Sequence, residues 1–217
     1  MDVLIYGGGL LGRQVHYLVE TYFGGSYRIL GFIDDVKEKE MEVVNDLRVL
    51  GSLEEMNTDP NYVPDRIALI MAIGYSNMPG RYTAFSRAKG MGYRFESLIH
   101  PEAVVEKNVR LGEGVVVLAG VVVDQYVEIR EANYLDIGVL VGENCMIGAN
   151  NYFSAGTTVG GSVTIGGGNF FGLSTTVVND ISIGNNNFIN AKTLIYKNIG
   201  DNKKVVELHE QHLSGKI

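Results

Sequence analysis

The chain has 217 residues, with 18 Lys and Arg against 25 Asp and Glu, which gives a formal net charge of -7. An acidic protein repels polyanions, which argues against nucleic acid or an anionic membrane as the partner. Its one cysteine, Cys145, excludes an intrachain disulfide and suits a reducing compartment. We see neither a signal peptide nor an apolar run of about 18 residues, so we expect no membrane insertion and a cytoplasmic location.

The chain opens on a strand, a glycine turn and a helix. The apolar run 3–6 leads into Gly7, Gly8 and Gly9, and with Gly12 the spacing fits G-x-G-x-x-G. A helical pattern with one apolar face follows, from about Val15 to Tyr22. This order is typical of a nucleotide-binding βαβ unit, in which the helix N-terminus favours a phosphate group.

Two further strands are predicted to end beside this turn. The segment 27–33 leads into Asp34 and Asp35, and the apolar segment 66–73 leads into Gly74 and Tyr75. Ligands of parallel sheets bind beyond the carboxyl ends of the strands. We therefore expect Gly8, Gly9, Asp34, Asp35, Gly74 and Tyr75 to form one substrate-binding crevice. The alternative for the two aspartates is a solvated acidic turn that caps a helix.

The second half of the chain repeats every six residues without a break. A bulky apolar residue recurs at this spacing, which fits neither an α-helix nor a single surface strand. The pattern is typical of a hexapeptide-repeat solenoid, in which three hexapeptides make one triangular coil and the apolar residue points inward. Gly148, Gly166 and Gly184 lie one coil apart, where we expect corners with unusual backbone angles. The repeated positions are Leu111, Val117, Val123, Ile129, Leu135, Val141, Ile147, Phe153, Val159, Ile165, Phe171, Val177, Ile183, Ile189 and Ile195.

These patterns divide the chain into an α/β Rossmann-like domain (1–97), an all-β hexapeptide-repeat rod (98–200) and a polar tail (201–217). His100 precedes a proline at the crossing between the first two parts, and we interpret it as a junction residue. In the tail, a short helix is predicted over 205–213. His209 and His212 are interpreted as part of a solvated helix rather than as metal ligands, so no metal site is predicted.

This organisation resembles the PglD/NeuD-type sugar acyltransferases of bacteria. The resemblance covers 2–198 and is carried by Ile5–Gly9, Gly31–Asp35, 72–74, Leu98–His100 and the repeats. It implies that the rod is a left-handed parallel β-helix and that the protein is a homotrimer. It also implies a nucleotide-linked amino sugar in the head, acetyl-CoA between neighbouring rods, and a role in surface-glycan biosynthesis.

Acyl transfer requires a base for the incoming nucleophile and a hydrogen-bond donor for the thioester oxygen. The family places a histidine and an acidic residue where this chain has Glu143 and Asn144. The backbone N–H facing the thioester falls on Gly161, and the resemblance extends the acetyl-CoA contacts to Gly160 and Ile183. Glu143 would serve as base if burial between subunits raised its pKa; the alternative is a solvated corner residue.

The chain departs from the family at three functional places. Glu143 replaces the catalytic histidine, Leu11 stands where the glycine turn often carries a histidine, and the end of the chain lacks a Gly-x-Pro-Ala-Lys segment. The main prediction is an acetyl-CoA-dependent sugar N- or O-acyltransferase. The alternatives are a catalytically impaired trimeric sugar-nucleotide-binding or scaffold protein, and an enzyme with different chemistry in the same cleft. A dinucleotide-dependent oxidoreductase is disfavoured because no second catalytic domain follows the short head.

Overall fold

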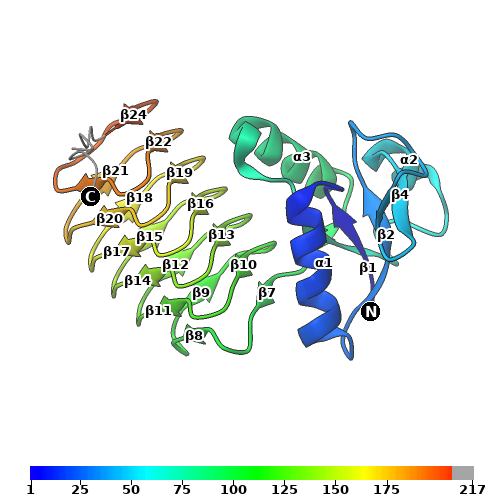
Figure 1. The fold of residues 1–217 in the computed structure, drawn as a ribbon, viewed down its shortest axis with the longest axis horizontal. Helices are drawn as coiled ribbons and strands as arrows, with labels where there is room; N and C mark the ends of the chain where they lie inside the picture. Colours follow the sequence, from blue (N-terminus) through cyan, green and yellow to red (C-terminus); the bar gives the residue numbers. More distant parts are fainter. Residues whose placement is uncertain (207–217) are drawn as a thin grey trace, which may run out of the picture.

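A computed structural model of the chain describes residues 1–206. Figure 1 shows two parts side by side, an α/β head formed by the first strands and helices and a rod of stacked coils. Helix α1 (Leu10–Phe23) faces the rod, and the far side of the head carries β3, β4 and α2. Among the described residues, no helix is long and apolar enough to cross a bilayer.

The head is built on a six-stranded sheet with the strand order β3-β4-β2-β1-β5-β6. Its strands pair in parallel except for β3, which is antiparallel to β4. The central strands β1 and β5 are almost fully buried, as expected for a parallel sheet covered on both faces. The strands are β1 (Asp2–Tyr6), β2 (Arg28–Ile33), β3 (Glu42–Val44), β4 (Leu47–Gly51), β5 (Ala68–Met71) and β6 (Arg94–Phe95).

The helices of the head begin where their sequences offer suitable caps. Ser52 forms a capping box with Glu55 at the start of α2 (Leu53–Thr58). Asn77 accepts a hydrogen bond from Gly80 at the start of α3 (Met78–Gly90), which the short 3-10 helix η1 (Tyr75–Asn77) precedes. The buried face of α1 contains Val15, Leu18 and Val19, as the helical pattern predicted.

A β-hairpin forms the edge of the head sheet. β3 and β4 are joined through Asn45 and Asp46, whose φ angles are 49° and 63°. Two consecutive positive φ values define the tight turn that matches the twist of a hairpin, and Asn and Asp tolerate them better than most residues.

The rod has three faces, each a parallel sheet of two-residue strands stacked from coil to coil. The head-facing sheet comprises β7 (Leu98–Ile99), β10 (Val116–Val117), β13 (Tyr134–Leu135), β16 (Tyr152–Phe153), β19 (Phe170–Phe171), β22 (Phe188–Ile189) and β24 (Lys204–Val205). The second sheet comprises β8 (Val104–Val105), β11 (Val122–Val123), β14 (Leu140–Val141), β17 (Thr158–Val159), β20 (Thr176–Val177) and β23 (Leu194–Ile195). The third sheet comprises β9 (Arg110–Leu111), β12 (Glu128–Ile129), β15 (Met146–Ile147), β18 (Thr164–Ile165) and β21 (Ser182–Ile183).

Each coil has the predicted length of three hexapeptides. Val117 pairs with Leu135 and Leu135 pairs with Phe153, so each residue lies over the one eighteen positions later. The predicted inward residues from Val117 to Ile195 are all buried, and Leu111 in the first coils is partly buried. The six-residue pattern therefore reports a continuous core that stacked repeats share.

The corners correct the reason given for the repeated glycines. Gly148, Gly166 and Gly184 do not have positive φ angles; the left-handed position lies two residues later, at Asn150, Gly168 and Asn186. A Cβ on Gly148 would lie 2.7 Å from the backbone of Gly166. These glycines are thus required by the close stacking of successive coils, and the turn conformation falls on their neighbours.

The head packs on one face of the rod through a shared core. Leu98, Val116, Tyr134 and Tyr152 of the head-facing sheet join the cluster formed by α1 and the head strands. Further along the rod, the ring of Tyr75 packs at a tilt against Tyr152 and Phe170, at centroid distances of 4.9 and 4.6 Å. The head and the rod are therefore held together by apolar and aromatic contacts.

Arg81 of α3 adds a polar connection to this junction. Its guanidinium is fully buried and donates to the carbonyl oxygens of Ile73 and Ala132 and to Oδ1 of Asn150. In the described part of the chain its terminal Nη2 has no partner, and burial lowers the Arg81 pKa to about 10. This side chain connects α3 to two corners of the rod.

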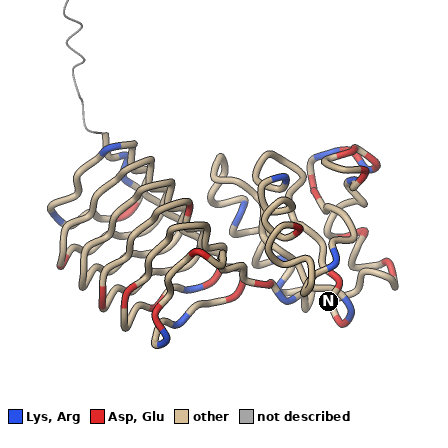
Figure 2. The backbone as a smooth tube through the Cα atoms, turned by 60° about the horizontal axis from the view of Figure 1, so that its bottom comes forward, with Lys and Arg blue, Asp and Glu red and all other residues tan. Residues whose placement is uncertain are grey.

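The rod continues past residue 200, where the sequence analysis placed the start of the tail. Strand β24 pairs with β22, so Lys204 and Val205 belong to the head-facing sheet. The helix predicted over 205–213 and the pair His209 and His212 lie almost entirely outside the described residues. Figure 2 shows charged residues around the head, on the first coils and at the corners of the rod.

Candidate functional site

The glycine turn has the geometry that its sequence motif predicts. Gly7 has a φ of 123°, and a Cβ there would lie 2.5 Å from the Ala72 carbonyl oxygen. A Cβ on Gly12 would lie 2.1 Å from the Gly7 carbonyl oxygen, so this glycine lets α1 approach the turn. Gly9 is the N-cap of α1, without a side-chain cap and with open space around it. The start of α1 can therefore receive a polar ligand group.

The two aspartates after β2 meet the glycine turn, but both have partners within the chain. Asp34 accepts from the N–H of Gly8 at 2.8 Å and from the N–H groups of Val36 and Lys37 at 3.0 Å. It thus fixes the turn instead of presenting a free carboxylate. The prediction that strand ends bring Gly8 and Asp34 together is confirmed by this contact.

Asp35 has a different set of partners. It accepts from Tyr6 Oη at 2.5 Å, from the N–H of Leu53 at 3.0 Å and from the guanidinium of Arg87. It therefore caps α2 and connects that helix to α3, which is close to the helix-capping alternative of the sequence analysis. Arg87 and Tyr6 complete this cluster, and no motif of the sequence indicated either residue.

Lys37 is a third residue that sequence reasoning missed. Its Cδ atom lies 3.2 Å from the position of a Gly8 Cβ, so its aliphatic chain covers the glycine turn. Among the described residues no carboxylate forms an ion pair with its ammonium group. A lysine beside an uncapped helix N-terminus is a suitable partner for a phosphate group. The only sequence signal was its position two residues after Asp35.

Gly74 and Tyr75 lie at the end of β5, as predicted. Gly74 begins the turn into η1, with nothing within 4 Å of its Cβ position. The Tyr75 ring is half exposed and stacks against the rod. The carboxyl ends of β1, β2 and β5 thus carry the glycine turn, the two aspartates and Tyr75 on adjacent strands.

A pocket opens between α1 and the first coils, with a cavity volume of about 390 Å³. We call it the junction pocket. Its head side is formed by the outer face of α1, and its rod side by the corner that joins the head-facing sheet to the second sheet. Arg13, Gln14 and Tyr17 line the first side, and His100, Tyr134 and Ile137 line the second. Apolar walls with a few polar groups are typical of small-molecule sites.

His100 contributes to this pocket as well as to the junction. It is buried, and its Nδ1 accepts from the N–H of Glu102 at 3.0 Å. Tyr22 packs edge-on against the ring at 4.2 Å. Because Nδ1 accepts, the neutral ring carries its proton on Nε2 and is a hydrogen-bond donor there.

The residues predicted for the chemistry lie on a different corner, which joins the second sheet to the third. Glu143 and Asn144 are exposed on the turn between β14 and β15. A Cβ on Gly161, one coil further, would lie 2.5 Å from Oε1 of Glu143. The missing side chain at Gly161 therefore leaves the space that the Glu143 carboxylate occupies.

The acetyl-CoA contacts expected around this corner have mixed support. The Gly161 N–H donates to Oδ1 of Asn179 at 3.1 Å, so it would face a thioester oxygen only after Asn179 moved. Gly160 lies beside the same amide. Ile183 points into the rod with 2% of its surface exposed, so its side chain is part of the rod core. Cys145 is buried and Sγ contacts the Gly160 carbonyl oxygen, as expected of a stacking residue.

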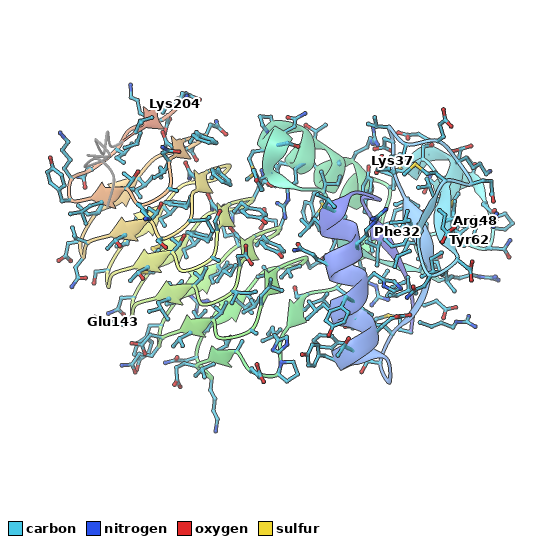
Figure 3. The ribbon with its side chains drawn as sticks, viewed as in Figure 1. Phe32, Lys37, Arg48, Tyr62, Glu143 and Lys204 are labelled. Carbon is cyan, nitrogen blue, oxygen red and sulfur yellow. The ribbon has the colours of Figure 1, made fainter. Side chains whose placement is uncertain are left out.

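Within one chain the two sets of predicted residues are separated. The corner that carries Glu143 is the one that does not border the head-facing sheet. Figure 3 places Glu143 on the side of the rod away from the head, whereas Lys37 lies on the head. A ligand bound at the head could reach Glu143 only on another copy of the chain. In the described residues no cluster of metal-ligating side chains is found.

The fold defines the class of structures to which the chain is similar: an α/β head followed by a left-handed parallel β-helix. No family model matches the sequence, and no curated protein matches it. Solved structures share this fold, and three of them show the extent of the similarity.

The acetyltransferase domain of PglB from Neisseria gonorrhoeae FA1090 is 24% identical with a TM-score of 0.81, over 91% of this chain and 92% of that one. PerB from Caulobacter crescentus, solved with CoA and GDP-perosamine, is 25% identical with a TM-score of 0.79, over 93% and 92%. WeeI from Acinetobacter baumannii AYE is 20% identical with a TM-score of 0.79, over 95% and 97%. The predicted fold and the resemblance to sugar acyltransferases are thereby confirmed at the level of architecture.

Proposed function

We propose that this chain is an acetyltransferase that moves an acetyl group from acetyl-CoA to a nucleotide-linked amino sugar. The observation that carries the proposal is the shared two-part fold, which spans nearly all of this chain and of PerB, a protein solved with CoA and GDP-perosamine. PglB, whose acetyltransferase domain has the same fold, was also solved with acetyl coenzyme A. Cytoplasmic surface-glycan biosynthesis is the setting we infer for this reaction.

The head supplies a suitable place for the nucleotide. The uncapped start of α1 and the Lys37 ammonium lie beside the glycine turn, and both favour a diphosphate. Gly9 and Gly74 leave room for a close approach, the Gly8 backbone forms part of the glycine turn, and Asp34 and Asp35 hold this turn and α2 in place. Tyr75 offers an aromatic edge at the rod side of this crevice.

A homotrimer would bring the two parts of the site together. The outward residues of the second sheet are uncharged from the first coil to the last, which suits contact with another copy. Ile137 of the junction pocket and Glu143 belong to the same coil. In copies related by an axis parallel to the rod, equal coils lie at equal heights, so the junction pocket of one copy would face the Glu143 corner of its neighbour. These outward residues are Val104, Val122, Leu140, Thr158, Thr176 and Leu194.

In this arrangement acetyl-CoA lies between neighbouring rods, with Glu143, Asn144, Gly160 and Gly161 on its thioester side. Holding both substrates in one cleft supplies much of the rate enhancement through proximity. The second candidate function is a sugar-nucleotide-binding or scaffold protein. The engagement of the Gly161 N–H by Asn179 favours this alternative, because it removes a donor from the thioester.

Acetyl transfer separates the two candidates. The assay follows CoA thiol release from acetyl-CoA with GDP-perosamine and with UDP-linked amino sugars as acceptors. A transferase releases the thiol only when an acceptor is present, and its unfolding temperature rises with acetyl-CoA and with the nucleotide sugar. Stabilisation by nucleotide sugars alone, without thiol release, would identify a binding protein.

A further inference from the structure

We propose that Asp136, beside the junction pocket, is the general base that accepts the proton of the acceptor nucleophile. This inference rests on the proposed acetyl transfer and assigns a residue to it. Asp136 lies directly between Leu135, which points into the rod, and Ile137, which lines the pocket. Asp136 directly follows β13, and its carboxylate interacts electrostatically with Tyr134, which lines the pocket.

The position of the Asp136 carboxylate is fixed by its neighbours. Oδ1 accepts from the N–H of Ile137 at 2.8 Å, and the N–H of Ala155 on the next coil also donates to the carboxylate. These bonds use part of its accepting capacity, since an ionised carboxylate has about four lone-pair sites. The remaining capacity is available to a ligand in the pocket beside it. A base must be held in place in this way before it can take a proton efficiently.

The surroundings of Asp136 also differ from those of Glu143. Burial raises the pKa of the Asp136 carboxyl, although the two backbone N–H groups oppose the shift. The titratable groups near it are few: Tyr134 and Tyr152 of the head-facing sheet interact electrostatically with Asp136, and both also interact with Arg81 of α3. From the facing side of the pocket, α1 adds Arg13 and the junction adds His100. Asp136 is thus half-buried and held by two backbone N–H groups, whereas Glu143 is exposed on its corner.

The proposed step balances as follows. The amine nitrogen or hydroxyl oxygen of the sugar bonds to the carbonyl carbon of acetyl-CoA as its proton moves to Asp136. The carbon–sulfur bond then breaks, CoA leaves as thiolate, and it takes up the proton from the Asp136 carboxylic acid. Asp136 is thereby returned to its ionised form. His100 donates from Nε2 to an acceptor atom of the sugar and holds it against the pocket wall.

The test compares three near-isosteric amide variants. Asp136→Asn removes the proposed base, Glu143→Gln removes the carboxylate predicted from the sequence, and Asp124→Asn is a matched control. Oδ1 of Asp124 accepts from the N–H of Gln125 at 2.7 Å, as Oδ1 of Asp136 accepts from Ile137. Position 136 tolerates small polar residues in this rod, because Ser154 and Asn190 occupy the same place on later coils. Asp136→Ser is therefore the second variant if Asp136→Asn does not fold.

The readout is the rate of acetyl transfer to whichever nucleotide-linked amino sugar the unmodified protein accepts. Asp136→Asn should lower kcat at least about 100-fold, the lower end for loss of a general base, and change the acceptor KM by less than about threefold. Glu143→Gln should lose less than about tenfold and Asp124→Asn almost nothing. The fall of kcat towards acidic pH should disappear in Asp136→Asn. If the unmodified protein is active and Asp136→Asn is equally active, or if Glu143→Gln loses more activity, the assignment of Asp136 is overturned but the proposed function is not. An inactive unmodified protein overturns the proposed function as well.

Discussion

The head and the rod obtain their structures in different ways. In the rod, a single rule acts at every sixth residue, and each coil repeats the contacts of the one below it. In the head, the polar contacts at the carboxyl ends of the strands depend on individual pairs of residues, such as Gly8 with Asp34 and Arg87 with Asp35. The rod therefore provides a regular support, and the specific polar chemistry concentrates in the head and at the junction between the two.

The largest expected effect is on the core of the rod. Phe153 is fully buried and stacks on Phe171 at 4.6 Å, so Phe153→Ala removes an inward side chain that two coils share. We expect a loss of about 3–5 kcal/mol in the free energy of unfolding, measured by denaturant titration. Tyr17→Ala on the exposed face of α1 is the control and should cost little. Equal losses in the two variants would mean that the rod core is not the main source of stability.

Arg81 tests the connection between the two regions. Arg81→Met keeps the length of the side chain but leaves the carbonyl oxygens of Ile73 and Ala132 and the amide of Asn150 without their donor. We expect a loss of about 2–3 kcal/mol, because buried acceptors are costly to leave unpaired. The exposed Arg66→Met serves as the control. A gain in stability would show that burial of this charge outweighs its hydrogen bonds.

Two glycines at different corners of the rod give a smaller and more selective effect. A Cβ at position 148 would meet the backbone of Gly166 at 2.7 Å, whereas at position 161 it would meet the flexible end of Glu143 at 2.5 Å. Gly148→Ala should cost about 1–3 kcal/mol, because the coils must separate. Gly161→Ala should cost less than about 1 kcal/mol while displacing the Glu143 carboxylate. Thermal unfolding of both variants checks this order, which reverses if Glu143 cannot move aside.

The smallest expected effect is on the pH dependence of stability. Burial raises the pKa of Asp136 in the folded protein, so the folded state binds a proton more readily than the unfolded chain. The cost of burying the ionised carboxylate lowers the free energy of unfolding. This loss is absent below the pKa of the unfolded chain, and it grows as the pH rises through the raised pKa of the folded protein. Asp136→Asn should therefore be slightly more stable than the unmodified protein near pH 7, by less than about 1 kcal/mol, and equal to it in acid. Denaturant titrations at several pH values measure this difference.

The sequence was most informative where one physical rule repeats. The inward positions, the coil length and the order of strand, glycine turn and helix follow from periodicity and from Gly7, Gly9 and Gly12. It was less informative where residues meet through the fold. Lys37, Arg87 and Asp136 have ordinary sequence neighbours, and their roles depend on contacts with segments far along the chain.

The misplaced interpretations have the same origin. The glycines at 148, 166 and 184 were assigned to turns, but their requirement comes from the coil stacked above each of them. The inward position of Ile183 follows from the same six-residue register that predicts the rod, and the resemblance alone could not show that its side chain lies in the core. The partner of the Gly161 N–H, Asn179, lies one coil away and carries no motif. The six-residue register shows whether a side chain points into the rod or out of it. It shows which residues are neighbours on successive coils only after the coil length is known.

The most direct test of the account is a crystal structure of this protein with CoA and GDP-perosamine. We predict a closed ring of copies in which the diphosphate lies beside Gly9 and Lys37 and the sugar enters the junction pocket next to Asp136. The CoA thiol should lie at the same height, between that pocket and the Glu143 corner of the neighbouring copy. A sugar bound away from Asp136, or CoA bound to a single copy far from the junction pocket, would contradict it.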